Sequence, residues 1–264
     1  MQITFLKLGG SLITDKSQTR TALHSEIDRI SQEIAHARKQ MPEKRILLGN
    51  GAGSFAHQSA HMYGTMDGFS NEEGLYGACV THQDAMRLNQ IVIESLLSAQ
   101  LPAFSVQPSA FISTRNKNIN TYDVSLIETM LQKNYIPVIY GDVIADSEIG
   151  STILSTDTLF RSLAEKLLAL HHTVTIIHAG NYPGVLDEQG NVIAKITPES
   201  MHSITSLQTS EQTDVTGGMK LKVEEMVRLA EKRIESHIID GTMLGAITKA
   251  LLGESIGTHI LPCL

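Results

Sequence analysis

Short apolar runs alternate along the chain with longer stretches in which apolar residues recur at a helical period. The apolar runs predict strands at residues 3–8, 45–48, 102–106, 136–140, 173–177, 236–239 and 258–261. The periodic stretches predict helices over residues 23–39, 71–97, 124–133, 155–170, 219–235 and 244–252, with a further helix start within 54–61. This alternation is typical of an α/β fold, so we expect a mostly parallel central sheet with helices on both faces.

Polar stretches separate these elements. Residues 63–70 and 114–121 are polar and predict loops, and residues 214–218 predict a loop just before the helix at 219–235. The run Asp187-Glu188-Gln189-Gly190-Asn191 is a signal for a hairpin turn.

Composition excludes several classes of protein. The chain has 264 residues, of which 42% are hydrophobic and 19% charged, so it can bury a sizeable core. A net charge of −7 and an aromatic content of 5% argue against nucleic-acid or membrane-surface binding. The two cysteines, Cys79 and Cys263, cannot form a disulfide framework. With no recognisable signal peptide and no apolar stretch long enough to span a bilayer, we expect a cytoplasmic protein.

The first predicted strand ends in a turn suited to holding phosphate. Gly9-Gly10-Ser11 follows the strand directly, with Lys7 before it and Lys16 after it. Glycines let the backbone approach an anion closely, exposed N–H groups form an anion nest, and the lysines add movable positive charges. Because open α/β sheets bind ligands at the carboxyl ends of their strands, we predict a phosphate site here.

A second glycine-bearing segment, residues 214–219, precedes Lys220 and Lys222. Alone it is most simply an ordinary loop with solvated lysines, but beside the opening stretch a shared phosphate site is an equally strong interpretation. The known nucleotide fingerprints are absent. No P-loop pattern occurs, and Ser54 stands where a dinucleotide fingerprint beginning at Gly49 needs its third glycine.

Two further side chains are candidates for the chemistry. His57 follows the glycine-bearing turn at residues 49–53, which delivers it to the end of a strand. Asp157 lies near a helix start, where a lone aspartate is usually a cap, but Ser155 is an equally good cap and leaves Asp157 free. The His171-His172 pair and the spacing of Cys79 and His82 are weak metal signals, and we predict no metal site from them.

With these residues assembled, the chain resembles the amino-acid kinase superfamily and, within it, the isopentenyl phosphate kinases. The resemblance covers nearly the whole length in the same segment order. It is carried by Lys7-Leu8-Gly9-Gly10-Ser11 with Lys16, Gly51-Ala52-Gly53-Ser54-Phe55-Ala56-His57, Tyr140-Gly141-Asp142-Val143, residues 214–219 with Lys222, and Gly253-Glu254 before Gly257-Thr258. It implies an amino-acid kinase-like three-layer αβα sandwich, with one domain of residues 1–264. Within that domain, residues 1–170 would form the acceptor-binding lobe and residues 171–264 the nucleotide-binding lobe.

The resemblance implies ATP-dependent phosphorylation of isopentenyl phosphate to isopentenyl diphosphate, by in-line phosphoryl transfer stabilised by lysines. The implied catalytic residues are Lys7, Lys16, His57 and Asp157. The implied contacts to ATP come from Lys7, Gly9, Gly10, Ser11, Gly53, Asn181, Gly218 and Lys222. The implied contacts to the acceptor come from Ala52, Gly53, His57 and Gly141. Mg²⁺ would enter with ATP, without protein ligands of its own, and a homodimer is expected.

The sequence also departs from the family pattern. Ala52 and Ala56 replace glycines of the acceptor turn, which either crowds the acceptor phosphate or stiffens the turn. Thr158 and Asn181 stand where the family tends to carry aspartates, so two acidic groups near the nucleotide are lost. Two alternatives therefore stay open, namely a fosfomycin-type phosphonate kinase and a nucleotide-binding module without catalysis.

Overall fold

Strand β1 (Gln2–Leu8) lies near the middle of the main sheet, and its apolar sequence fits this buried position. The computed structural model describes residues 1–201, 203–204 and 214–263, with the backbone alone for 214–218. Within this part of the chain, eight strands form one sheet in the order β10-β12-β11-β9-β1-β2-β6-β3. The other strands are β2 (Arg45–Asn50), β3 (Ala103–Ser105), β6 (Ile136–Tyr140), β9 (Thr173–Gly180), β10 (Lys195–Ile196), β11 (Glu235–Asp240) and β12 (Thr258–Ile260).

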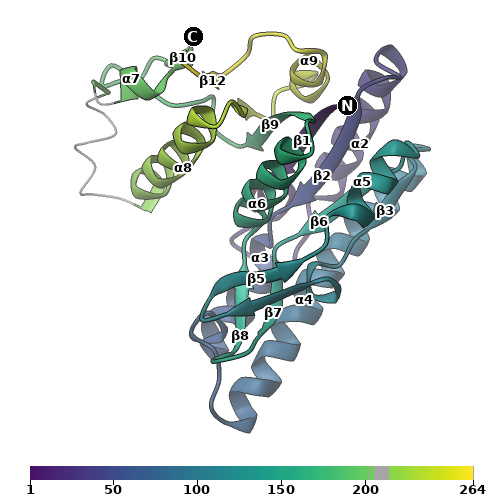
Figure 1. Ribbon diagram of the computed structural model, residues 1–264, viewed down its shortest axis with the longest axis vertical. Helices are drawn as coiled ribbons and strands as arrows, with labels where there is room; N and C mark the ends of the chain where they lie inside the picture. Colours follow the sequence, from purple (N-terminus) through teal and green to yellow (C-terminus); the bar gives the residue numbers. More distant parts are fainter. Residues whose placement is uncertain (202, 205–213, 264) are drawn as a thin grey trace.

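The sheet is mostly parallel and is covered by helices on both faces. In the region described, neighbouring strands pair in parallel except for β11 with β12. One face packs against α2 (His24–Gln40), α4 (Glu72–Ser98) and α9 (Ala246–Leu252), and the other against α5 (Ser125–Gln132), α6 (Thr156–Ala169) and α8 (Asp214–Glu231). Figure 1 shows these layers, with α2 and α4 on one side and α6 and α8 on the other. The predicted three-layer αβα sandwich is confirmed.

Alternation along β1 explains how the layers form. Leu6 and Leu8 pack into the core under α2 and α4, whereas Ile3 and Phe5 pack into the core under α6. Since successive side chains of a strand point to opposite faces, Lys7 lies on the α6 face with Phe5. Burial of a large apolar side chain contributes roughly 1.5–3 kcal/mol, so this pattern determines which face each residue takes.

The strands divide on either side of β1 according to their place in the sequence. The strands that precede residue 170, namely β2, β6 and β3, lie on one side of β1. The strands that follow it, namely β9, β11, β12 and β10, lie on the other. The carboxyl edge of β1 therefore stands where the two halves of the chain meet.

A second sheet was not predicted from the sequence. Strands β4 (Ile112–Arg115), β5 (Asn118–Tyr122), β7 (Asp142–Asp146) and β8 (Gly150–Leu154) form it in the order β5-β4-β7-β8, beside α4 (Figure 1). The predicted loop at 114–121 is therefore wrong, because these residues belong mainly to the β4–β5 hairpin. Polar side chains are tolerated there since β5 is an edge strand with largely exposed residues.

The side chain of Asp146 joins the two hairpins of this sheet. Its carboxylate accepts hydrogen bonds from the backbone N–H groups of Asn116, Lys117, Glu148 and Ile149. These bonds outweigh the effect of burial and lower the pKa of Asp146. A single aspartate thus satisfies donors from two turns that are about thirty residues apart.

The remaining elements are short connections and turns. Helices α1 (Gly10–Ile13), α3 (Gly53–Tyr63) and α7 (Pro198–Met201) and the 3₁₀ turns Thr65–Asp67 and Pro108–Ala110 complete the described part. The predicted turn at Asp187 is confirmed, since its N–H donates to the carbonyl of Asn191 over 2.9 Å. The predicted loop at 214–218 is wrong, because α8 already begins at Asp214. Among the described helices, none combines the length and apolar character needed to cross a membrane.

Candidate active site

Four neighbouring parallel strands end in turns at the same edge of the main sheet. Strand β9 leads to Asn181, β1 to Gly9 and Gly10, β2 to the turn before Gly53, and β6 to Gly141. The backbones of two of these turns touch, because a Cβ on Gly10 would stand 2.6 Å from the Cα of Gly53. The glycine-bearing turns recognised in the sequence therefore lie at one carboxyl edge of the sheet.

Lys7 and Asp157 form an ion pair at this edge. Ser155 caps helix α6 by accepting a hydrogen bond from the N–H of Thr158 at 3.1 Å, so the carboxylate of Asp157 is free to pair with the Nζ of Lys7. Burial raises the pKa of Asp157, but the Lys7 ammonium and the nearby His178 lower it more strongly, and the net shift is downward. The Asp157 carboxylate is therefore ionised at neutral pH and holds the Nζ of Lys7 in place.

His178 completes this cluster. It lies on β9 directly beside Lys7 in the parallel register. Its Nδ1 lies 3.3 Å from the Oδ1 of Asp157, although the two atoms do not form a hydrogen bond in this geometry. Burial and the positive charges of Lys7 and Lys222 lower the pKa of His178 in spite of the carboxylate. The imidazole is therefore neutral at neutral pH.

The opening turn contacts the turn after β9. The Ser11 hydroxyl donates to the Oδ1 of Asn181 over 3.2 Å, so the structure brings two of the predicted ATP-binding residues together. The N–H of Gly9 donates to the carbonyl of Ala179 over 2.8 Å. That N–H is used within the fold. Gly9 therefore contributes to the site by letting a ligand approach the backbone closely.

Lys222 reaches the same region from helix α8. Its Nζ donates to the hydroxyl of Tyr182 over 2.8 Å and lies 5.3 Å from the centre of that ring. Together with Lys7 and Gly9 it lines a cavity of about 20 Å³, the size of a single water site. Gly218 lies in α8 one turn before Lys222, and its surroundings are outside the described residues.

Lys16 lies in an exposed loop between Thr14 and Ala22. These two residues form an isolated antiparallel bridge, and the N–H of Arg20 donates to the carbonyl of Ser54 over 3.1 Å. The Arg20 guanidinium also pairs with the buried Asp84 at 2.7 Å. These contacts hold the ends of the loop against the rest of the protein, and Lys16 between them is exposed to solvent.

His57 stands one turn into α3 and is exposed to solvent. The protein around the ring and the Lys16 ammonium lower the pKa of His57. The structure therefore places Lys16 and His57 within electrostatic reach of each other, and the imidazole is neutral at pH 7.

The acceptor turn tolerates both alanines. Ala52 has φ −72° and ψ −23°, an ordinary right-handed conformation that any residue adopts. Ala56 is buried against Ala85 and Tyr140, so its methyl group fills space in a small core. Gly53 in contrast has φ +52° and stands against Thr14, and here only glycine fits.

Two networks behind the turns keep them in place. Asp142, which follows Gly141, accepts from the Nδ1 of His82 at 2.7 Å and from the N–H of Ser109 at 3.0 Å. Its carboxylate raises the pKa of His82. This pairing fixes the Gly141 turn from the side of α4.

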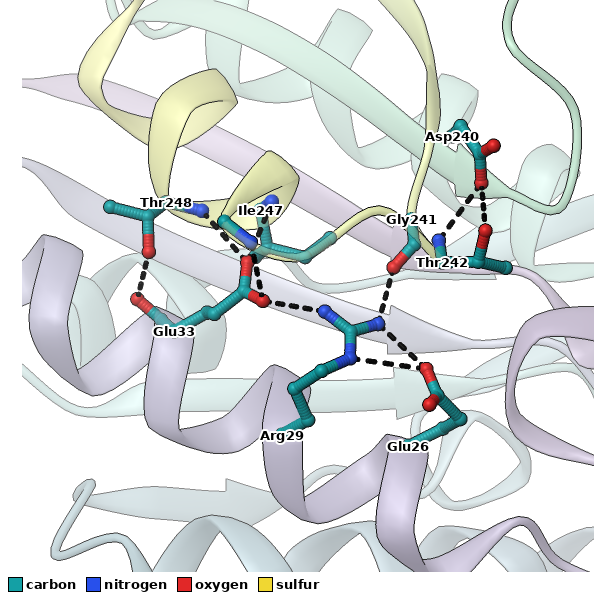
Figure 2. A network of polar contacts seen from close by, with 9 residues as sticks. Glu26, Arg29, Glu33, Asp240, Gly241, Thr242, Ile247 and Thr248 are labelled. Carbon is teal, nitrogen blue, oxygen red and sulfur yellow. Dashed lines mark hydrogen bonds and ion pairs between the residues drawn. The ribbon is translucent and has the colours of Figure 1, made fainter.

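The second network fixes the end of β11. Figure 2 shows Arg29 of α2 bridging Glu26, Glu33 and the carbonyl of Gly241. Glu33 in turn accepts from the N–H of Gly245 at 2.9 Å and of Ile247 at 3.0 Å, at the start of α9. The N–H of Gly241 donates to the carbonyl of Gly180 over 2.8 Å, so the network supports the turn that carries Asn181.

The described side chains at this edge lack the ligands of a metal site. Among the described residues, no group of three or more His, Cys, Asp or Glu side chains is placed to hold an ion. The carboxylate of Asp157 is engaged by Lys7, and that of Asp142 by His82 and Ser109. Lys7 and Lys222 bring ammonium groups to the same edge. This donor set fits an anion and does not fit a protein-bound Mg²⁺.

Comparison with known proteins identifies the family. The sequence pattern of the amino acid kinase family matches residues 2–240. The chain belongs to the amino acid kinase family. It is 35% identical over 263 residues to the isopentenyl phosphate kinase of Methanothermobacter thermautotrophicus, with 97% of each chain covered. The enzyme of the same name from Methanocaldococcus jannaschii is 35% identical over 269 residues, with 98% of each chain covered.

A solved structure of isopentenyl phosphate kinase has the same fold. It superposes with a TM-score of 0.81 at 32% identity, and the match covers 98% of this chain and all of that one. Membership of the amino acid kinase family confirms the resemblance inferred from the motifs. It also fits the mostly parallel sheet and the glycine-bearing turns at its carboxyl edge.

Two side chains in this member of the amino acid kinase family were missed by the sequence reasoning. His178 precedes the turn after β9, and Tyr182 follows it. The signal for both in the sequence was their position at the end of β9, close to the predicted ATP-binding residue Asn181. Their partners, Asp157 and Lys222, could be assigned only from the packing of α6 and α8 against the sheet.

Proposed function

We propose that this protein is an ATP-dependent kinase that converts isopentenyl phosphate to isopentenyl diphosphate. The observation that carries the proposal is the contact between the Gly10 turn and the Gly53 turn. It sets a turn suited to nucleotide phosphates directly against the turn that delivers His57. A donor phosphate on one turn and an acceptor phosphate on the other would therefore be neighbours, as in-line transfer requires. The two relatives that are 35% identical to this chain, and that match 97% and 98% of it, are both named isopentenyl phosphate kinase.

The lysines supply the charge stabilisation in this mechanism. Lys7, oriented by Asp157, would contact the transferring phosphoryl group, and Lys222 would hold the nucleotide phosphates from the side of α8. Lys16, at the tip of a tied loop, would bridge the donor and the acceptor. Gly9, Gly10, Ser11, Gly53, Asn181 and Gly218 would shape the ATP phosphate site. Preorganised charges of this kind lower the barrier because they are in place before charge develops.

His57 would bind the phosphate of the acceptor. Its neutral imidazole can donate one N–H to a phosphate oxygen, while Ala52, Gly53 and Gly141 would line the same end of the site. A phosphate monoester has a second pKa near ~6, so the acceptor is already deprotonated at neutral pH and needs no strong general base.

The tail of the acceptor would lie along α3. Tyr63 is six residues after His57, which corresponds to about 9 Å along a helix axis. Met62, Tyr63 and Phe69 line a cleft of about 640 Å³, whose other lining residues include Asp67, Glu73 and Glu148. The side chains of Met62, Tyr63 and Phe69 offer apolar contact to an uncharged tail, and the three carboxylates disfavour a second anionic group.

Further features follow from the proposed activity. Mg²⁺ would arrive with ATP and be held by phosphate oxygens and water. Residues 1–170 would serve as the acceptor-binding lobe and residues 171–264 as the nucleotide-binding lobe, in line with the division of strands around β1. We further propose a cytoplasmic homodimer acting in isoprenoid biosynthesis.

A screen for acceptor-dependent ADP release tests the proposal. Purified protein is incubated with ATP and Mg²⁺ and with isopentenyl phosphate, with fosfomycin, or with no acceptor, and ATP binding is measured by calorimetry. Release with isopentenyl phosphate at a kcat/KM at least about a hundredfold above that with fosfomycin is expected, a difference of about 2.7 kcal/mol in transition-state binding. A preference for fosfomycin, or tight ATP binding without release, would contradict the proposal.

A further inference from the structure

His178 is placed beside Lys7 by the architecture of the sheet. The two residues are partners in the parallel register of β1 and β9, so their side chains leave the same face. On the other side of Lys7, its partner on β2 is Gly49. A Cβ there would stand 2.6 Å from the ring of Phe160, so the absence of a side chain lets α6 approach. The first turn of α6 therefore sets Asp157 over both Lys7 and His178.

The two oxygens of Asp157 are used differently. Oδ2 pairs with the Nζ of Lys7. Oδ1 lies 3.3 Å from the Nδ1 of His178, and both atoms are buried without a hydrogen-bond partner in the described part of the chain. A buried polar atom without a partner is costly, and a small rotation of the imidazole would satisfy both atoms at once.

The charges around the ring favour a neutral imidazole that donates. Lys7 on β1 and Lys222 on α8 face it as cations, Asp157 on α6 faces it as an anion, and burial opposes protonation. A neutral ring carries one N–H. With Asp157 as the acceptor on the Nδ1 side, the favoured tautomer has its proton on Nδ1.

We propose that His178 is a positioning residue for phosphoryl transfer, which donates its Nδ1–H to the Oδ1 of Asp157 and so keeps that oxygen away from Lys7. The inference rests on the kinase activity proposed above. An ammonium group has three N–H donors. If Asp157 accepts from Lys7 through Oδ2 alone, two N–H donors of Lys7 stay available for phosphate oxygens. If both oxygens of the carboxylate accept from Lys7, only one N–H donor stays available.

Two substitutions separate this role from simple packing. His178→Asn keeps an N–H donor at the same number of bonds from the backbone as Nδ1, whereas His178→Leu fills similar space without a donor. His36→Leu, at an exposed position of α2, is the matched control. Turnover with ATP and isopentenyl phosphate, the dissociation constant for ATP and the melting temperature are measured for all variants.

We expect His178→Leu to lower kcat about tenfold to a hundredfold, the scale of one lost hydrogen bond to a charged group, with an unchanged KM for the acceptor. His178→Asn should recover at least a third of the wild-type kcat, and His36→Leu should behave as wild type. A kcat within twofold of wild type for His178→Leu would overturn the inference, and so would equal losses in the Asn and Leu variants.

A second readout does not depend on turnover. Nitrogen NMR of histidine-labelled protein with ATP bound reports the tautomer of each ring, and the His178→Asn variant assigns the signal. The expected form is neutral with the proton on Nδ1, and a proton on Nε2 alone would contradict the inference. If the wild type released no ADP with any acceptor, the proposed function would fail, while this measurement would still decide whether His178 donates its Nδ1–H to Asp157.

Discussion

Lys7 and Asp157 are 150 positions apart in the sequence, yet they form an ion pair at the carboxyl edge of the main sheet. Neither side chain is free to move far, since Lys7 projects from a central strand and Asp157 from the first turn of α6. The carboxylate of Asp157 orients the ammonium group of Lys7, which is the group that would meet phosphate. Removal of either charge should therefore affect turnover more than folding.

Asp157→Asn should lower kcat about a hundredfold, the scale on which one preorganised charge contributes to a transition state. The side chain keeps its size, but Lys7 loses the anion that directs it. Steady-state kinetics with both substrates check this, and circular dichroism confirms folding. Asp187→Asn, at an exposed hairpin turn, is the matched control and should retain wild-type kinetics. A similar loss in both variants would contradict the assigned role.

Lys16→Ala should lower kcat about a hundredfold to a thousandfold while the protein stays folded. The side chain is exposed, and the loop that carries it is held by backbone contacts of Thr14, Arg20 and Ala22, which the substitution leaves intact. Lys133→Ala, another exposed lysine, serves as control. Near-normal turnover in Lys16→Ala would show that the loop lysine does not take part in phosphoryl transfer.

His57→Ala should raise KM for isopentenyl phosphate about tenfold to a hundredfold, because it removes a hydrogen bond to a charged group. KM for ATP should stay within twofold, since His57 lies on the acceptor turn. His61, one turn further along α3 and also exposed, offers the control His61→Ala. An unchanged acceptor KM in His57→Ala, measured at saturating ATP, would remove His57 from the site.

Gly53→Ala should destabilise the fold more than the same change at Gly190. Both glycines have positive φ, at +52° and +82°, which costs about 1–2 kcal/mol for alanine. At Gly53 the new Cβ would also lie 2.2 Å from the Thr14 hydroxyl, whereas at Gly190 no atom of the described residues lies within 4 Å. Overpacking adds about 1–3 kcal/mol. Urea unfolding of the two variants should show this difference, and equal losses would contradict the close contact.

Stability should fall as the pH drops from 7 to 4, in part because of His237. Burial and the nearby His259 lower the pKa of His237 to about 4, from 6.5 in the unfolded chain. Between pH 6.5 and pH 4, His237 takes up a proton in the unfolded chain but stays neutral in the native state. The stabilisation is therefore complete above pH 6.5 and is lost progressively down to pH 4, by up to about 3 kcal/mol.

Urea unfolding of the wild type and of His237→Gln at pH 7.5 and pH 4.5 measures this effect. The variant should lose less stability over the same interval, because its side chain does not titrate. His61→Gln, at an exposed position, should follow the wild type. Identical pH dependence in all three proteins would show that His237 does not contribute.

Elements with a regular apolar pattern were predictable from the sequence, whereas short, polar and exposed elements were not. The long helix α4 and strands β1 and β9 follow directly from periodicity, because a buried face requires a regular repeat. Strand β5 is polar and mostly exposed, so its sequence resembles a loop. It forms because β4 beside it offers free backbone groups and because Asp146 ties the turn at Asn116 and Lys117.

The order of residues by itself determined the fold class, the phosphate-suited turn after β1, and the candidates Lys7, Lys16, His57 and Asp157. Apolar periodicity and glycine-bearing turns are local properties, and the sequence carries them directly. Only the tertiary structure decided that Asp157 pairs with Lys7, that His178 joins them, and that Tyr182 holds Lys222. These pairings depend on the register of parallel strands and on the distance between a helix and a sheet, and both are set by packing between segments far apart in the chain.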